Sequence, residues 1–229
     1  MSRLRQVARS DSSDPVVHGM YDLVFGKDVD PMSPDAPRTD TGSRGDWWTT
    51  FALVPDVLEH AVAGFVLYRS PERRLDPVLR ELALARIGWA VGSAFVYSQH
   101  VQALRGLGAP DGQVVDLPAW SVSGAYGPTE RAVLAYADAL ATQGGRVSDG
   151  CFGALQAVLG DEEILELTYV GALYVQHAVM SRALRLEWDD RPDPVTTVDP
   201  PEGFDASRFA TTGADSSARQ QLARLRGRR

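Results

Sequence analysis

The sequence has little of what several common kinds of protein site require. Its 229 residues contain a single cysteine, Cys151, so the chain alone can form neither an internal disulfide nor a cysteine-rich metal site. No run reaches the roughly 18 apolar residues that a membrane-spanning helix needs. The first residues, MSRLRQVARSDSSD, lack the apolar segment of a secretory signal. These absences predict a cytoplasmic protein without a membrane partner.

Positive charge is also scarce over most of the chain. The formal net charge is −7, and a surface of that sign repels nucleic-acid phosphates, so we expect no nucleic-acid partner. The exception is the arginine-rich segment from Asp215 onward. For this segment a solvated tail and an anion-binding role are both open.

Helical signals dominate what is present, and no convincing series of strands is found. Apolar residues recur at helical spacing, and Asp, Ser and Pro stand where helices begin. We expect helices over 15–25, 46–68 (one helix broken at Pro55, or two), 77–90, 128–142 and 161–188. Two more are expected from 94 to Gly106 or Gly108, capped by Ser93, and over 149–160, capped by Ser148. The predicted fold is all-α, a bundle-like unit of six or seven helices.

Composition divides the chain into parts. Residues 1–45 predict an N-terminal arm and a loop, because 26–45 are rich in proline, glycine and aspartate. Residues 46–190 carry the main helical domain. Residues 191–229 are proline-rich and then basic, which predicts a C-terminal tail.

Two titratable side chains lie in the middle of largely apolar helices. They are Glu81 and His100. A partly desolvated carboxylate beside an imidazole can poise a base or a proton relay near neutral pH. Spacing alone leaves the structural alternatives open: a hydrogen-bonded core histidine, and a salt bridge from Glu81 to Arg80, Arg86 or another helix.

The run RELALARIGWAVGSAFVYSQHVQALRGLG, residues 80–108, resembles the signature segment of carboxymuconolactone decarboxylases and the related alkylhydroperoxidase D family. The resemblance extends from about residue 47 to 190, through PTERAVLAYADAL and the last predicted helix. It implies the helical fold of that family. It also implies a homo-oligomer, commonly a trimer or hexamer, with sites near subunit contacts.

In the peroxidase branch of that family, a glutamate, a C-x-x-C pair and a histidine four residues later form a proton-relayed dithiol site. Glu81 and His100 match the glutamate and the histidine, whereas Ser93 and Val96 stand at the cysteine positions. Since attack on a peroxide requires a thiolate, dithiol peroxidase activity is not expected. The decarboxylase branch carries acidic residues just before the histidine, and residues 94–99 have none, so the exact decarboxylation is not carried over.

The resulting hypothesis is a cofactor-independent acid/base enzyme, a lyase or isomerase acting on a small lactone-like or carboxylated metabolite. His100 would exchange a proton at the carbon next to a carbonyl, and Glu81 would set the His100 tautomer. Tyr97 or Ser93 would hydrogen-bond the developing enolate oxygen. A core aromatic and a helix cap are the structural alternatives for these two residues.

Further side chains are expected to bind the substrate: Val96, Trp48, Tyr174 and His177. Packing in the core or at a subunit contact is the alternative for His177. No two of the four histidines are spaced as a metal pair on a helix, so neither a metal nor an organic cofactor is predicted. The alternative functions are a non-catalytic binding or oligomeric scaffold of the same fold and, third, a peroxidase-like antioxidant protein.

Overall fold

A computed structural model describes residues 2–190, 197–200 and 223 of the chain. Within these residues the backbone forms nine α-helices, two 3-10 helices and no strand, which confirms the predicted all-α class. The elements are η1 (Arg9–Asp11), α1 (Pro15–Val24), α2 (Asp46–Phe51), α3 (Pro55–Tyr68), α4 (Pro77–Val91), α5 (Ala94–Gly106), α6 (Asp111–Val115), η2 (Leu117–Val122), α7 (Pro128–Thr142), α8 (Asp149–Gln156) and α9 (Asp161–Leu184).

The helices outnumber the six or seven predicted because short elements were missed. Residues 111–127, expected as a loop, contain α6 and η2. Pro118 lies in the first turn of η2, where the N–H that it lacks would be unpaired in any case. At the other end of the chain, α9 stops at Leu184 instead of residue 188. Arg185 there takes a left-handed conformation with φ of 54°.

Local signals fix the corner between α4 and α5. The Asp76 carboxylate caps α4 by accepting from the backbone N–H groups of Val78 and Leu79. Gly92, with φ of +83°, ends α4, and the Ser93 hydroxyl oxygen caps α5 by accepting from the Val96 N–H. The two helices therefore fold back on each other.

Helix α4 is the centre of the bundle. It packs against α5, α7 and α9, and each of its residues from 80 to 88 is buried. A Cβ on Gly88 would lie 2.5 Å from the backbone nitrogen of Tyr97, so the absence of a side chain lets α5 approach closely. The close packing of α4 against α5 at Gly88 sets the distance between the side chains on their facing surfaces.

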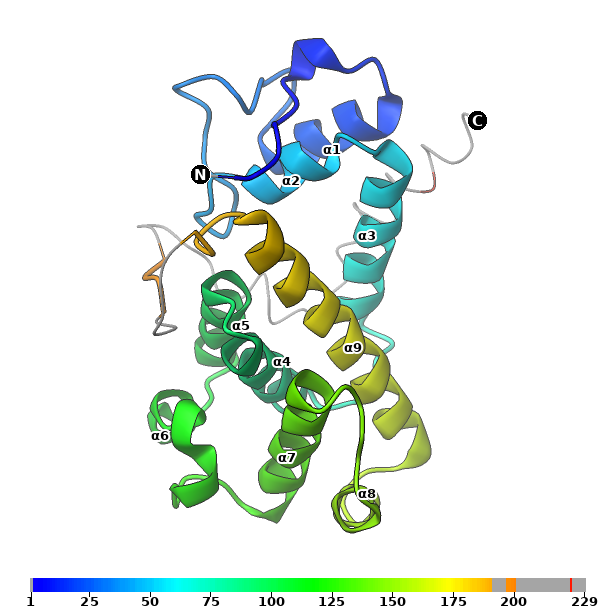
Figure 1. Cartoon of the computed structure of the whole chain (residues 1–229), viewed down its shortest axis with the longest axis vertical. Helices are drawn as coiled ribbons and strands as arrows, with labels where there is room; N and C mark the ends of the chain where they lie inside the picture. Colours follow the sequence, from blue (N-terminus) through cyan, green and yellow to red (C-terminus); the bar gives the residue numbers. More distant parts are fainter. Residues whose placement is uncertain (1, 191–196, 201–222, 224–229) are drawn as a thin grey trace.

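Helix α9 joins two layers of the molecule. It runs diagonally from α8 to the region of α1 and α2 (Figure 1). One hydrophobic cluster joins α4, α7, α8 and most of α9, and another joins α1, α2, α3 and Leu186 just after α9. Phe65 and Phe95 pack against both clusters, so they mark the boundary between the layers.

The N-terminal segment is part of this packing. Val17, Met20 and Tyr21 of α1 are fully buried in the second cluster. The Tyr21 hydroxyl also donates to the backbone carbonyl of Val7 at 2.7 Å. Of the predicted tail, the arginine-rich end falls outside the described residues.

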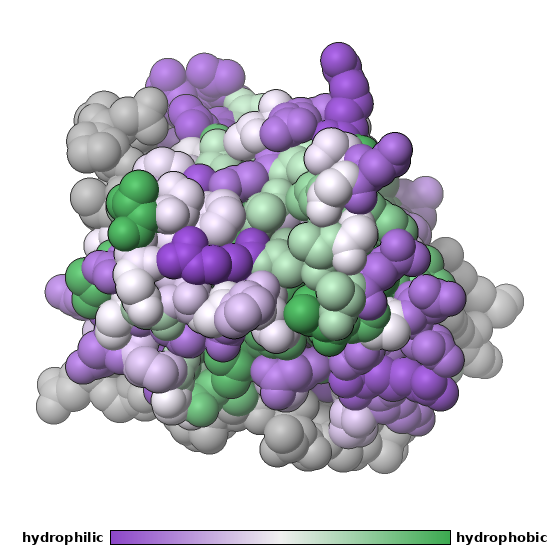
Figure 2. Space-filling model, turned by 90° about the horizontal axis from the view of Figure 1, so that it is seen from below, coloured by the Kyte–Doolittle hydropathy of each residue, from purple (hydrophilic) through white to green (hydrophobic). Residues whose placement is uncertain are grey.

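The surface is mixed in character. Seen from below, the molecule shows hydrophilic side chains over much of its face and hydrophobic ones gathered in smaller areas (Figure 2). Among the described helices, none combines the length and apolar composition needed to cross a membrane.

Candidate functional site

The Glu81 carboxylate is the hub of a buried polar cluster. One of its oxygens, Oε2, lies 2.6 Å from Nδ1 of His100. The other, Oε1, accepts from the Tyr68 hydroxyl at 2.6 Å and from Nε of Arg80 at 3.0 Å. Three helices, α3, α4 and α5, thus supply the four side chains that we call the paired cluster: Tyr68, Arg80, Glu81 and His100.

Partners keep the Glu81 carboxylate charged although it is fully buried. Burial by itself raises the pKa of Glu81, but the charge and hydrogen bond of His100, the Arg80 charge and the Tyr68 hydroxyl outweigh it and lower the pKa. Burial and the neighbouring Glu81 charge raise the pKa of Tyr68 well above its usual range. The cluster therefore holds an ionised carboxylate and a neutral phenol.

The orientation of His100 follows from this pairing. An ionised carboxylate only accepts hydrogen bonds, so Nδ1 of His100 carries the proton shared with Glu81. Nε2 is then the ring nitrogen left for a molecule in the adjoining cavity, which His100 lines. The Tyr174 ring contacts the imidazole edge-on, with 4.4 Å between centroids, and fixes its plane.

The cavity lies where the two hydrophobic layers meet, and its volume is about 310 Å³. Aromatic side chains make much of its wall: Trp47, Trp48, Phe65, Phe95 and Tyr174. Polar lining comes from the loop before α2, through Thr39, Asp40, Thr41 and Ser43, and from Arg69 and Gln99. The loop predicted over residues 26–45 thus contributes part of the wall.

A second histidine lines the same cavity from α9. His177 is 5% exposed, and neither of its ring nitrogens has a hydrogen-bond partner among the described residues. Burial, with a smaller contribution from His100, lowers the pKa of His177 to about 4. It is therefore neutral at neutral pH.

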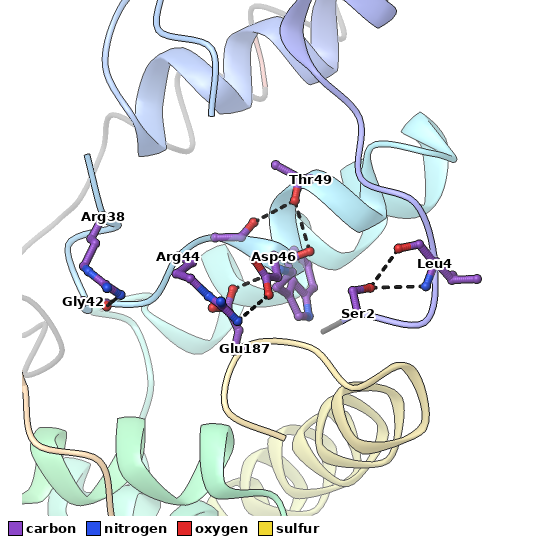
Figure 3. A network of polar contacts seen from close by, with 10 residues as sticks. Ser2, Leu4, Arg38, Gly42, Arg44, Asp46, Thr49 and Glu187 are labelled. Atoms are coloured by element: carbon purple, nitrogen blue, oxygen red, sulfur yellow. Dashed lines mark hydrogen bonds and ion pairs between the residues drawn. The ribbon is translucent and has the colours of Figure 1, made fainter. Parts of the chain in front are cut away.

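The wall around Trp47 is held by a carboxylate from the end of α9. The Trp47 backbone N–H donates to Oε1 of Glu187 at 3.0 Å, beside the ion pair between Arg44 and Asp46 (Figure 3). Burial raises the pKa of Glu187 to about 7. Glu187 thus ties the start of α2 to the end of α9, next to the cavity.

Most of the residues singled out from the sequence gather here. Glu81 contacts His100, and the cavity is lined by His100, Val96, Trp48, Tyr174 and His177. Val96 and His100 are four residues apart on α5 and share a helix face.

Two predicted residues, Tyr97 and Ser93, lie outside the lining of the cavity. Tyr97 packs with Leu82 and Val101 in a third hydrophobic cluster, because a three-residue step leaves it about 60° around the helix from His100. The Ser93 hydroxyl caps α5 and donates to Asp189 at 2.6 Å. Neither side chain lines the cavity, so the predicted contact with an enolate oxygen is not supported for either.

Sequence reasoning missed Tyr68. It lies at the end of α3, and its hydrogen-bond partner Glu81 is 13 residues further along the chain on another helix. No local spacing connects the two. Of the open pairings for Glu81, the structure selects Arg80, because Arg86 pairs with Asp138.

The described residues contain no group of three His, Cys, Asp or Glu side chains arranged to hold a metal ion. Cys151 is partly exposed on α8 and is not among the residues that line the cavity. The two imidazoles that line the cavity are those of His100, with Glu81 behind it, and His177.

Comparisons with known proteins agree with the predicted family. Residues 55–139, from the start of α3 into α7, match the model of the carboxymuconolactone decarboxylase family. No curated protein matches the sequence.

Solved structures share the fold. The apo debrominase Bmp8 is 16% identical, with a TM-score of 0.59 over 96% of this chain and 96% of that chain. A cysteine-to-alanine variant of Bmp8 in complex with 2,3,4-tribromopyrrole is 16% identical, with a TM-score of 0.61 over 98% of this chain and 100% of that one. An AhpD-like protein of unknown function from Agrobacterium tumefaciens is 23% identical, with a TM-score of 0.56 over 64% of this chain and 96% of that chain.

Proposed function

We propose that the chain is a cofactor-independent acid/base enzyme, a lyase or isomerase acting on a small lactone-like or carboxylated metabolite, as its match to the carboxymuconolactone decarboxylase model over residues 55–139 suggests. The observation that carries the proposal is the 2.6 Å contact between Glu81 and His100 at the wall of a cavity of about 310 Å³. A buried carboxylate–imidazole pair whose imidazole lines a cavity is an arrangement suited to proton transfer.

The chemistry begins at Nε2 of His100. This nitrogen takes a proton from the carbon next to a substrate carbonyl, and the electron pair moves onto the carbonyl oxygen as an enolate. The imidazolium that forms is stabilised by the ionised Glu81, whose charge Arg80 and Tyr68 hold in place. Return of the proton to a different carbon gives an isomerase.

A lyase follows from the same geometry in the opposite order. A substrate with a carboxylate β to its carbonyl loses carbon dioxide and leaves an enolate. Protonated His100 then delivers its proton to the carbon that carried the carboxylate. Both routes need only proton transfer by the chain's own side chains.

The direct test is proton exchange, because it needs no knowledge of the final product. A panel of lactones and β-keto acids is incubated with the protein in D₂O, and loss of the α-proton signal is followed by NMR. We expect at least one compound to exchange its α-proton faster with the wild-type protein than in buffer without protein. His100→Ala should abolish that rate while the free energy of unfolding changes by no more than about 3 kcal/mol.

The matched control is His60→Ala on α3, since His60 is exposed and does not line the cavity. This variant should exchange at the wild-type rate. An undiminished rate in His100→Ala would refute the assignment. If no compound exchanges and the fold is intact, the non-catalytic scaffold becomes the better reading.

The debrominase likeness adds a compound to this panel. The related structure holds 2,3,4-tribromopyrrole in a cysteine-to-alanine variant. In this chain Cys151 does not line the cavity, so we assign no thiol step. Tribromopyrrole is therefore tested as a ligand, and loss of bromide with a dithiol reductant in a Cys151→Ala variant would contradict the acid/base proposal.

Self-association completes the proposed function. Helix α9 exposes large apolar side chains at Leu165, Tyr169 and Val179. Such side chains on one long helix favour contact with another copy of the chain, as in the trimers or hexamers of the resembled family. Light scattering at micromolar concentration should give a multiple of the 24.9 kDa chain mass, and a monomeric mass would contradict the proposal.

A further inference from the structure

His177 differs from the other buried polar groups of the cavity because it lacks a partner. Both of its ring nitrogens are without a hydrogen bond to any residue that the structure describes, although the side chain is 5% exposed. An unsatisfied buried donor or acceptor costs about 1–3 kcal/mol. A molecule in the cavity that His177 lines is positioned to relieve this cost.

The ring is also held in place by its neighbours. Phe65 stacks on it with 4.8 Å between centroids and 25° between planes. Trp47 and Tyr174 contact it at 5.8 and 5.6 Å. A ligand that binds His177 therefore meets a fixed group and need not order it first.

The charge state of His177 restricts what it can bind. Burial keeps the imidazole neutral, so it offers one N–H donor and one nitrogen acceptor. The same desolvation opposes a permanent formal charge on the ligand that binds next to the ring. The aromatic walls formed by Trp47, Trp48 and Phe65 favour a flat apolar body.

We propose that His177 binds the substrate directly, through a hydroxyl, carbonyl or ring nitrogen on an uncharged planar ring. This rests on the proposed function for the role of His100 and narrows its substrate class.

The two histidines then act on one molecule. The Tyr174 ring contacts both imidazoles, with centroids 4.4 Å from His100 and 5.6 Å from His177, and both histidines line the same cavity. While His100 takes the proton from carbon, the N–H of neutral His177 donates to the oxygen that becomes the enolate. A neutral imidazole stabilises such an oxygen without surrendering its own proton. This is the contact that the sequence assigned to Tyr97 or Ser93.

Binding of three matched probes tests the proposal without turnover. The probes are 2-naphthol, 2-methylnaphthalene, which replaces the hydroxyl with a methyl group, and 2-naphthoate, which replaces it with a charge. Dissociation constants are measured by equilibrium dialysis. We expect the wild type to bind 2-naphthol more tightly than either of the other two.

His177→Phe supplies the decisive comparison, because it keeps a ring on Phe65 and removes both nitrogens. The preference for 2-naphthol over 2-methylnaphthalene should fall about tenfold, in line with the loss of one buried hydrogen bond. His177→Leu is a second apolar variant, should the phenylalanine prevent folding. His177→Gln, which restores a donor and an acceptor, should recover part of the preference, and His60→Phe on the surface should leave it unchanged.

An undiminished preference in the apolar variants would overturn the proposal, as would failure of the wild type to bind 2-naphthol. The outcome is separable from that of the proposed function. If the preference for 2-naphthol depends on His177 but no proton exchange is seen in D₂O, only the acid/base chemistry is refuted. If proton exchange is seen but the preference for 2-naphthol is the same in the His177 variants, only the proposed role of His177 is refuted.

Discussion

Buried titratable groups on two sides of the cavity differ in whether their partners or desolvation set their pKa. In the paired cluster, hydrogen bonds and opposite charges outweigh desolvation, and the fully buried Glu81 keeps a lowered pKa. On the other side, which we call the α9–α2 side and define by His177, Glu187 and Trp47, desolvation prevails. There the pKa of His177 falls to about 4 and that of Glu187 rises to about 7.

The difference lies in the charge of the partners and not in the depth of burial. Glu81 has three side-chain donors, from His100, Tyr68 and Arg80. Glu187 is contacted by neutral donors, among them the Trp47 N–H, and the neighbouring Asp46 charge raises its pKa further. His177 has no hydrogen bond to the described residues. A site that moves protons needs a stable charge behind its base, whereas a site that binds a neutral ring does not.

The largest expected effect comes from breaking the paired cluster. Glu81→Ala leaves the Arg80 guanidinium buried without its carboxylate and removes the acceptor of both Tyr68 and His100. Loss of one member of a buried ion pair typically costs about 3–5 kcal/mol. Denaturant unfolding should therefore show a drop of that size in the free energy of unfolding, with no proton exchange remaining.

The matched control is Glu162→Ala. Glu162 pairs with Arg74 at 2.9 Å, but both side chains are about two-thirds exposed. Exposed pairs are worth at most about 1 kcal/mol, so this variant should unfold nearly as the wild type does. If Glu81→Ala and Glu162→Ala lost equal free energy of unfolding, the contacts of the paired cluster would contribute no more to stability than an exposed ion pair.

A somewhat smaller effect is expected on the α9–α2 side, and it depends on pH. The folded state raises the pKa of Glu187 from 4.5 to about 7, so it holds a proton that the unfolded chain releases. Stability contributed by this group is present below about pH 4.5 and is lost as pH rises through about 7. Glu187→Gln removes that loss while keeping an oxygen for the Trp47 N–H.

Measured against the wild type, Glu187→Gln should therefore gain stability between pH 5 and pH 8. A shift of this size corresponds to an order of 3 kcal/mol. Urea unfolding of both proteins at the two pH values gives the difference directly, because other titrating groups cancel. A constant difference across this range would show that Glu187 is ionised in the folded protein and belongs with the paired cluster.

The features of the fold that the sequence predicts are those fixed by residues close together in the chain. The starts of α4 and α5 follow from Asp76, Pro77 and Ser93, which act on backbone groups within three residues. The end of α9 does not follow from local signals. It is set where Arg185 turns left-handed and the chain buries Glu187 against α2, which is a contact distant in sequence.

The same distinction applies to the site. Glu81 and His100 stand out as titratable residues on apolar helices, but their contact depends on how α4 and α5 pack at Gly88. Tyr68 could not be found, because α3 reaches Glu81 only in three dimensions. Tyr97 lies outside the cavity lining although its three-residue spacing from His100 suggested a shared helix face, because the cavity lies on the Val96 side of α5.

The smallest expected effect separates these two tyrosines with one substitution. Tyr68→Phe removes a 2.6 Å hydrogen bond to the ionised Glu81, and bonds to charged groups contribute about 1.5–3 kcal/mol. Tyr97→Phe removes a hydroxyl that makes no hydrogen bond within the described part of the chain, so its cost should stay below about 0.5 kcal/mol. Proton exchange should slow in the first variant and stay unchanged in the second. If proton exchange were slower in Tyr97→Phe than in Tyr68→Phe, the substrate would contact the Tyr97 face of α5 and not the Val96 face. The role that the sequence predicted for Tyr97 would then be supported.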